Sequence, residues 1–261
     1  MNGNQKILVV LVVLSSIIPM WFIWNNVSPI PSNDVVSGDI KETNTFFRFE
    51  GEPYIITAYI PQDRFDAYDD SWIIRYLSHI NNSYRYITPD DPVIQDIAKQ
   101  IENKTLGWSD VDRANFTLAY TQALPYKSDN SLYGTRDYWA FPIETLYHNG
   151  GDCKNKSILY VSIMRAMGYD AILVGNRSHA VSGVNIDGLT GQNITHFGKT
   201  YYLADSTTKT QIGVLDGDGY VPAIWFNMIG LAFIIVWLVI LIISIKGYKE
   251  YGNIEENNDE E

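Results

Sequence analysis

The sequence predicts an α+β domain that is attached to a membrane at both ends. Three observations lead to this prediction. A segment with helical periodicity begins at the single cysteine, Cys153. Three β-rich segments follow it between residues 170 and 204, and a helix followed by antiparallel strands is typical of α+β domains. Apolar runs lie close to both termini and are long enough to be considered as membrane spans.

The two apolar runs are Ile7–Trp24 and Pro222–Ile245. The second carries no charge and, at about 24 residues, has the length of a transmembrane helix. The first is near the lower limit for a span, so a cleaved signal peptide is the alternative. No small-x-small motif follows it, which favours an uncleaved anchor. The expected division is an anchor over 1–25, a linker over 26–44, a domain over 45–221, a span over 222–245 and an acidic tail over 246–261.

Basic residues next to the two runs predict the orientation in the bilayer. Lys6 precedes the first run, and Lys246 and Lys249 follow the second. Basic residues favour the cytoplasmic side, so both termini are expected in the cytoplasm and the domain outside the cell. Acceptor sequences for N-glycosylation (Asn-x-Ser/Thr) occur more often than chance predicts, which agrees with an extracellular domain. They begin at Asn26, Asn81, Asn103, Asn115, Asn155, Asn176 and Asn193.

Composition excludes several classes of function. The chain has 19 Lys and Arg against 30 Asp and Glu, a net charge of −11, which argues against a nucleic-acid partner. One cysteine excludes an intramolecular disulfide, and the four histidines lack the spacing of metal ligands. The acidic turn at 216–219 lacks the closing Glu of an EF-hand loop. We therefore expect neither a metal nor a cofactor.

Hydrophobic periodicity predicts the elements of the domain. Two β-rich runs around Glu50-Gly51 predict a hairpin over 46–60. Apolar residues at spacings of three and four predict helices, and these cover 66–80, 91–101, 109–124 and 153–167. A polar loop is expected over 126–138. Strands are expected over 170–174, 180–186 and 200–204.

Cys153 stands at the start of its helix, directly after a glycine-rich turn. Unpaired amides at a helix start favour a thiolate and can also hold an oxyanion. A nucleophilic cysteine needs a base, and the base needs an orienting partner. His179 opens one strand and Asp205 ends another, so adjacent antiparallel strands would bring them together. A small buried cysteine without a catalytic role is the alternative.

The other three histidines are poorer candidates for the base. His79 lies near the end of the helix expected over 66–80, beside its apolar stripe. His148 precedes the glycine turn, and His196 lies in a polar loop. These positions predict packed or solvated side chains rather than catalytic ones.

The motifs around the three candidates resemble the transglutaminase-like superfamily, most closely its archaeal membrane-attached members. They are GGDCKNKSILYVSIMRAMGYDAILV around Cys153, SHAVSGV around His179 and YYLADST around Asp205. The segments 120–126 and 137–146 are also similar. The resemblance implies a papain-related fold and acyl transfer through a thioester, with Cys153 as nucleophile, His179 as base and Asp205 as orienting residue. Lys154 departs from the family, in which the residue after the cysteine is often acidic.

Three further residues receive predictions. Gln122 is a candidate side-chain donor to the oxyanion, with a surface amide as the alternative. Trp139, together with the loop 126–138, is expected to form the rim of a substrate groove. Asn155 lies one turn into the cysteine helix, where a glycan would obstruct the site, so we expect it to be unmodified.

The predicted function is that of a membrane-anchored thiol enzyme acting on a protein or peptide at the cell surface. Transfer of the acyl group to water would make it a protease or amidase, and transfer to an amine would make it a transglutaminase. A non-catalytic surface module that binds a peptide or glycan is the first alternative. A structural envelope protein, in which the domain is a spacer, is the second.

Overall fold

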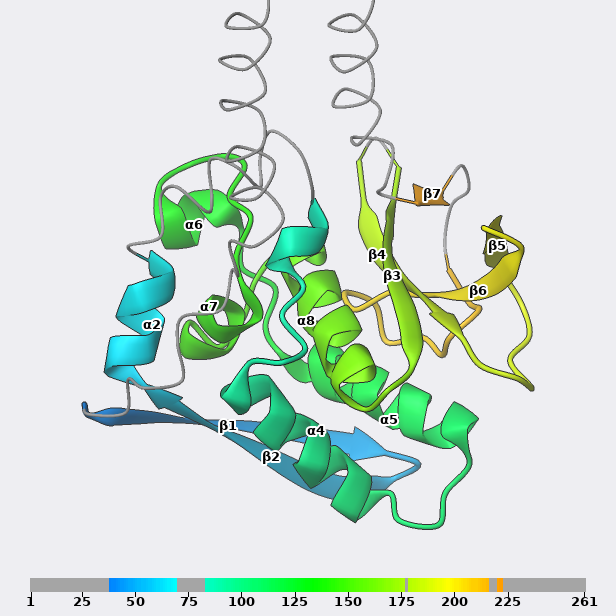
Figure 1. Ribbon diagram of the computed structural model, residues 1–261, viewed down its shortest axis with the longest axis horizontal. Helices are drawn as coiled ribbons and strands as arrows, with labels where there is room; N and C mark the ends of the chain where they lie inside the picture. Colours follow the sequence, from blue (N-terminus) through cyan, green and yellow to red (C-terminus); the bar gives the residue numbers. More distant parts are fainter. Residues whose placement is uncertain (1–37, 70–82, 177, 216–219, 223–261) are drawn as a thin grey trace, which may run out of the picture.

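The computed structural model describes residues 38–69, 83–176, 178–215 and 220–222 (Figure 1). They form the mixed domain of helices and sheet that the sequence predicts. Within these ranges no helix is long and apolar enough to cross a membrane. The predicted anchor, the acidic tail, His79 and all of the predicted C-terminal span except Pro222 lie outside the described residues.

A β-hairpin opens the domain, helices follow, and a five-stranded sheet closes it. The hairpin strands are β1 (Ile40–Phe49) and β2 (Glu52–Pro61). The helical elements are α2 (Gln62–Asp69), the 3-10 turn η1 (Ser83–Tyr86), α4 (Pro92–Lys104), α5 (Asp110–Ala123), α6 (Asp129–Tyr133), α7 (Pro142–Tyr147) and α8 (Cys153–Ala166). The strands of the sheet are β3 (Asp170–Gly175), β4 (Ala180–Asn185), β5 (Asn193–His196), β6 (Lys199–Ala204) and β7 (Val221–Pro222).

Strands β1 and β2 form a long antiparallel hairpin that lies along helices α4 and α5 (Figure 1). Its turn is Glu50-Gly51, where both φ angles are positive, 50° and 90°, as a tight two-residue hairpin requires. Because β1 begins at Ile40, the predicted linker over 26–44 is wrong for its last residues. These residues, 40–44, are too polar to show the pattern of a strand.

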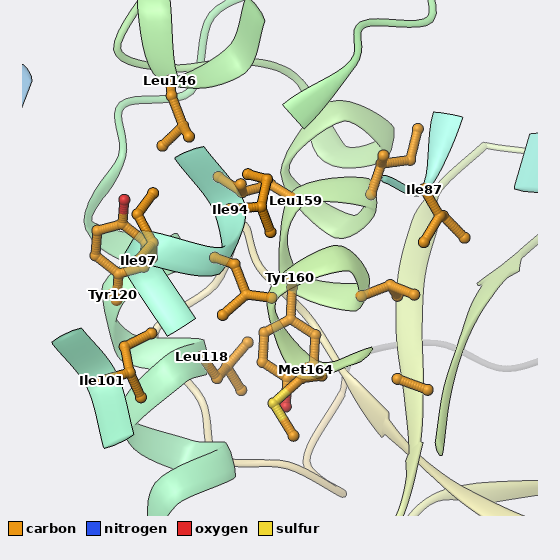
Figure 2. Close-up of a cluster of buried hydrophobic side chains, with 14 of the residues drawn as sticks. Ile87, Ile94, Ile97, Ile101, Leu118, Tyr120, Leu146, Leu159, Tyr160 and Met164 are labelled. Atoms are coloured by element: carbon orange, nitrogen blue, oxygen red, sulfur yellow. The ribbon is translucent and has the colours of Figure 1, made fainter. Parts of the chain in front are cut away.

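Helix α8 is the centre of the fold. It packs against strands β3 and β4 and against helices α4, α5 and α7 (Figure 1). Figure 2 shows the junction of α4, α5 and α8, where Ile97, Leu118, Leu159 and Met164 meet, each at most 1% exposed. Burial of side chains of this size stabilises the fold by roughly 1.5–3 kcal/mol each. This packing therefore fixes the position of α8, the helix that begins at Cys153.

The sheet has the order β5-β6-β4-β3-β7, and all neighbouring strands are antiparallel. Strand β4 lies beside β6, with Ser182 opposite Ala204. The first residues of β4 and the last residues of β6 consequently lie at the same end of the sheet. Ser157 of α8 donates a hydrogen bond to the carbonyl of Ala180, so this end faces the first turns of the helix.

Several short elements depart from the prediction. The loop expected over 126–138 contains helix α6, and α7, β5 and β7 were not predicted, because elements of two to six residues produce no periodic pattern. The helix expected over 66–80 begins earlier, at Gln62, and is described only to Asp69. Pro222, the first residue of the predicted span, belongs to β7, where it lies opposite Val174.

Candidate active site

A two-glycine turn leads the chain into the cysteine helix. Gly150 has a φ of 143°, and a Cβ at this position would lie 2.5 Å from the carbonyl oxygen of Pro125. Only glycine fits such a close approach. Hydrogen bonds from Gly151 to Pro125 (3.3 Å) and from Lys127 to Gly151 (3.1 Å) then fix the turn against the segment 125–127. The position of Cys153 is set by this packing of backbone on backbone.

The start of α8 is capped by Asp152. Its carboxylate accepts a hydrogen bond from the amide of Asn155 (3.0 Å), and its carbonyl accepts one from the amide of Lys156 (3.0 Å). Among the described residues, the amides of Cys153 and Lys154 have no such acceptor. These two N–H groups carry the partial positive charge of a helix start and lie beside the half-buried thiol of Cys153.

His179 and Asp205 come together at the end of the sheet. His179 directly precedes β4, and Asp205 directly follows β6. The imidazole Nε2 of His179 lies 2.9 Å from Oδ2 of Asp205. The side chain of His179 is 26% exposed and that of Asp205 only 6%. The ring is thus held from the buried side, and its other face remains accessible.

The imidazole of His179 also interacts with Cys153. The hydrogen bond to Asp205, followed by the interaction with Cys153, raises the pKa of His179 to about 10, although burial lowers it. Since Nε2 faces Asp205, Nδ1 is the ring nitrogen left for Cys153. The imidazole of His179 is therefore protonated at neutral pH, which places a positive charge near the sulfur of Cys153.

The carboxylate of Asp205 is fixed through both oxygens. Oδ2 faces His179, while Oδ1 accepts hydrogen bonds from the hydroxyl (2.6 Å) and the amide (2.7 Å) of Thr207. Burial raises the pKa of Asp205, but the bonds from His179 and Thr207 outweigh it and lower the pKa to about 2. This group is consequently an anion over the whole physiological range.

Gln122 supports Asp205 from the end of α5. Its Nε2 donates to the carbonyl oxygens of Asp205 and Thr210, both at 2.9 Å. Both N–H groups of the amide are directed at these two carbonyls. The oxyanion role stays a prediction that would require one of the two bonds to break, and in this structure Gln122 holds the loop that follows β6.

The structure pairs the backbone of Tyr126 with that of Gly151, two residues before Cys153. The side chain of Tyr126 is 62% exposed, and partial burial, followed by the charges of Cys153, Asp152 and Asp129, raises the pKa of Tyr126. The sequence offered one signal for this residue, its place directly after Pro125. Trp139 is partly buried and packs against Tyr86, with ring centroids 5.6 Å apart. Its place on a substrate rim stays a prediction.

Lys154 is bound by three carboxylates. Its Nζ lies 2.5 Å from Asp129, 2.8 Å from Asp152 and 3.2 Å from Asp137. Burial lowers the pKa of Lys154, but the hydrogen bonds that Lys154 donates to Asp129 and Asp152 raise it overall. The charge of Lys154 is thus compensated locally, and its ion pair with Asp129 joins helix α6 to the start of α8.

Asn155 is fully buried, as the expectation of an unmodified side chain requires. Its amide nitrogen donates to Asp129 (3.0 Å), and its amide oxygen accepts from the backbone of Ala140 (3.0 Å). Both ends of the side-chain amide are therefore used inside the domain. A glycan at this position is incompatible with the folded protein.

The sequence did not indicate the burial of a second lysine of α8. Lys156 is 1% exposed, and its Nζ has one long hydrogen bond, 3.4 Å, to the carbonyl of Gln122. Burial lowers the pKa of Lys156 to about 8, and the charge of Asp205 works against this shift. Periodicity could not reveal the position, because lysine at a buried position breaks the apolar pattern.

The other described histidines lie in aromatic surroundings. His148 packs edge-on against Phe65, Tyr133 and Tyr147, and His196 packs on Phe197. In the described ranges no three side chains of His, Cys, Asp or Glu form a group that could hold a metal ion.

No protein-family model matches the chain, and no curated protein matches it. Among solved structures, LapG of Legionella pneumophila is similar over 50% of this chain and 86% of its own, with 16% identity and a TM-score of 0.34. The EGTA-treated form of the same protein is similar over 50% and 83%, with 16% identity and a TM-score of 0.35.

Proposed function

We propose that this protein is a membrane-anchored cysteine enzyme of the transglutaminase-like superfamily, acting on peptide or carboxamide bonds through a thioester. The observation that carries the proposal is the 2.9 Å pairing of His179 with Asp205 where the sheet meets the start of α8, at which Cys153 stands and acts on the pKa of His179. A nucleophile in contact with a base, which a carboxylate orients, is the arrangement that thiol enzymes require. The sequence motifs around the three residues support the same assignment.

In the first half of the proposed reaction, the thiolate of Cys153 attacks the carbonyl carbon of the substrate. A C–S bond forms, and the carbonyl electrons move to the oxygen, which the amides of Cys153 and Lys154 stabilise. The imidazolium of His179 then gives its proton to the leaving amine while the C–N bond breaks. A thioester and a neutral imidazole result.

In the second half, the neutral imidazole of His179 takes a proton from water or from an amine. The oxygen or nitrogen attacks the thioester, and the C–S bond breaks to regenerate the thiolate and the imidazolium. Water gives a carboxylic acid, and an amine gives a new amide. Asp205 stays ionised throughout and stabilises the charged ring.

We propose further that the domain lies outside the cell and that both termini lie in the cytoplasm. The basic residues Lys6, Lys246 and Lys249 support this orientation. The acceptor residues Asn103 and Asn193 are exposed on the folded domain. Substitution of both by Gln should increase the electrophoretic mobility of the protein from a glycosylating host. An unchanged mobility, together with protease resistance of the domain in intact cells, would contradict the extracellular assignment.

The activity is tested with the full-length protein in mild detergent. Fluorescein-labelled casein reports hydrolysis, and incorporation of dansylcadaverine into unlabelled casein reports transfer to an amine. We expect at least one of these signals in the wild type and neither in Cys153→Ala. Equal signals in both proteins would overturn the assignment of the nucleophile. A silent wild type whose Cys153 also reacts like an ordinary thiol would favour the non-catalytic module.

A further inference from the structure

The two outer edges of the β1–β2 hairpin differ in chemistry. Thr57 of β2 directs its backbone away from β1, because its N–H and carbonyl bond the side-chain amide of Gln100 at 3.2 Å and 2.8 Å. Pro53 and Pro61 occupy the same set of alternating positions on β2, and proline has no N–H to offer. The edge of β2 is therefore closed to another strand.

The edge of β1 is open. Asn44 lies opposite Thr57, so its backbone also points out of the hairpin, and so does that of every second residue along β1. These residues are Glu42, Asn44, Phe46 and Arg48, and all four are exposed. Within the described part of the chain, their outward N–H and carbonyl groups have no hydrogen-bond partner. A row of free donors and acceptors is what an added strand pairs with.

A hollow of about 650 Å³ borders the same part of β1. Phe46, Phe47 and Phe49 of β1 contribute aromatic surface, and Ala119 and Ala123 of α5 leave room on the helix side. Phe46 is 74% exposed, which is unusual for so large an apolar side chain. The hollow is large enough for several side chains of a bound segment.

The charged residues around the hollow indicate which side chains a bound segment would carry. Arg48 and Lys209 line the hollow together with a single acid, Glu50. On β1, Phe46 and Arg48 are two residues apart and face the same side, so an added strand would place two alternating side chains beside them. An apolar residue suits Phe46, and an acidic residue suits Arg48.

We infer that the open edge of β1 binds an extended polypeptide segment of another protein, one that carries alternating apolar and acidic side chains. The segment adds to the hairpin as a third strand and places its inward side chains in the hollow beside Phe47 and Phe49. Gln122 lines this hollow and also holds the backbone of Asp205, so the bound segment lies next to the support of the active site. The assignment of this segment to the substrate rests on the proposed function. The binding of the segment to β1 does not depend on that function.

Fluorescence anisotropy with the full-length Cys153→Ala protein tests this inference without turnover. The probe is a fluorescein-labelled peptide, Gly-Ser-Val-Leu-Val-Glu-Val-Ser-Gly. We expect saturable binding that Asn44→Pro weakens about tenfold or more, because proline removes an outward N–H and leaves the β1–β2 ladder intact. Tyr59→Pro is the matched control: it makes the same change on the outer edge of β2 and should leave the affinity unchanged.

Exchange of the charges on Arg48 and on the peptide's Glu tests whether these two side chains lie beside each other. Arg48→Glu should weaken binding of the probe about three- to tenfold, and replacement of the peptide's Glu by Lys should restore it. Absence of saturable binding, or equal affinity in Asn44→Pro, overturns the inference even if the enzyme is active. A concentration-dependent dimer that Asn44→Pro converts to a monomer would also overturn it, since a second copy of this chain would then occupy the edge.

Discussion

Nε2 of His179 lies 2.9 Å from Oδ2 of Asp205, although 26 positions separate the two residues in the chain. The antiparallel pairing of β4 with β6 accounts for this contact, because it brings the start of one strand beside the end of the other. The pair lies where the first turn of α8 meets the sheet. A buried carboxylate thus holds the ring from one side and leaves its second nitrogen for Cys153.

Loss of the negative charge of Asp205 should disable the site. In Asp205→Asn the amide cannot stabilise the imidazolium, so less of the imidazolium of His179 forms at neutral pH and Cys153 loses the positive charge near its sulfur. We expect turnover of the casein probe to fall about a hundredfold or more. Wild-type activity in a folded Asp205→Asn protein would show that the carboxylate does not serve the reaction.

The His179–Asp205 pair should stabilise the fold in a defined pH window. The pKa of His179 is raised from 6.5 to about 10, so its contribution is complete below pH 6.5 and is lost as the pH rises through 10. The pKa of Asp205 is lowered from 3.8 to about 2, so its contribution is complete above pH 3.8 and is lost as the pH falls through 2.

Urea denaturation across this range measures the effect. The free energy of unfolding of the wild type should exceed that of His179→Gln by roughly 1–3 kcal/mol at pH 5 to 6. The difference should shrink steadily above pH 6.5 and become small near pH 10. A difference that is constant from pH 5 to 10 would mean that the charge of the ring does not contribute.

Two probes separate the roles open to Gln122. Alkylation of a thiol by iodoacetamide forms no oxyanion, whereas amide hydrolysis does. If Gln122 positions Asp205, as its bonds to the carbonyls of Asp205 and Thr210 indicate, Gln122→Leu should lower the rates of both reactions, hydrolysis by about tenfold. A variant with slow hydrolysis but unchanged alkylation would assign the oxyanion role instead.

Replacement of the buried Lys156 should stabilise the fold at neutral pH. The pKa of Lys156 is lowered from 10.5 to about 8, so below pH 8 its charge is buried at a cost, and this cost disappears as the pH rises towards 10.5. Lys156→Met should raise the free energy of unfolding at pH 7 by about 2 kcal/mol. Lys104→Met, an exposed change on α4, is the control and should have little effect.

A Lys156→Met protein that is less stable than the wild type at pH 7 would contradict this reasoning. Activity then gives a second measurement. Because Lys156 reaches the carbonyl of Gln122, which holds Asp205, the variant should also change the pH profile of turnover above pH 8. A purely structural residue would leave that profile unaltered.

The sequence predicted the parts of the fold that have strong periodicity or clear end signals. Helices α4 and α5 begin at Pro92 and Asp110, each within one residue of the predicted starts at 91 and 109. The turn of the hairpin followed from Glu50-Gly51. The first residues of β1 were missed because they are too polar to be distinguished from a linker. Helix α6 was missed because five residues are too few for a pattern.

The same limits apply to the site. Strand order placed His179 and Asp205 together, because antiparallel neighbours in the sheet can be inferred from short connections. The bonds of Gln122 and the burial of Lys156 join α5, α8 and the loop after β6, and such contacts depend on tertiary packing that no local pattern encodes. The pairing of Tyr126 with Gly151 has the same origin.

The rate of Cys153 alkylation by iodoacetamide as a function of pH tests the central claim most directly. In the wild type we expect faster labelling between pH 6 and 8 than in His179→Ala, because the imidazolium of His179 places a positive charge near the sulfur in that range. In His179→Ala, labelling should be slow at pH 6 and rise only in the alkaline range where an ordinary thiol ionises. Identical profiles in the two proteins would contradict the account.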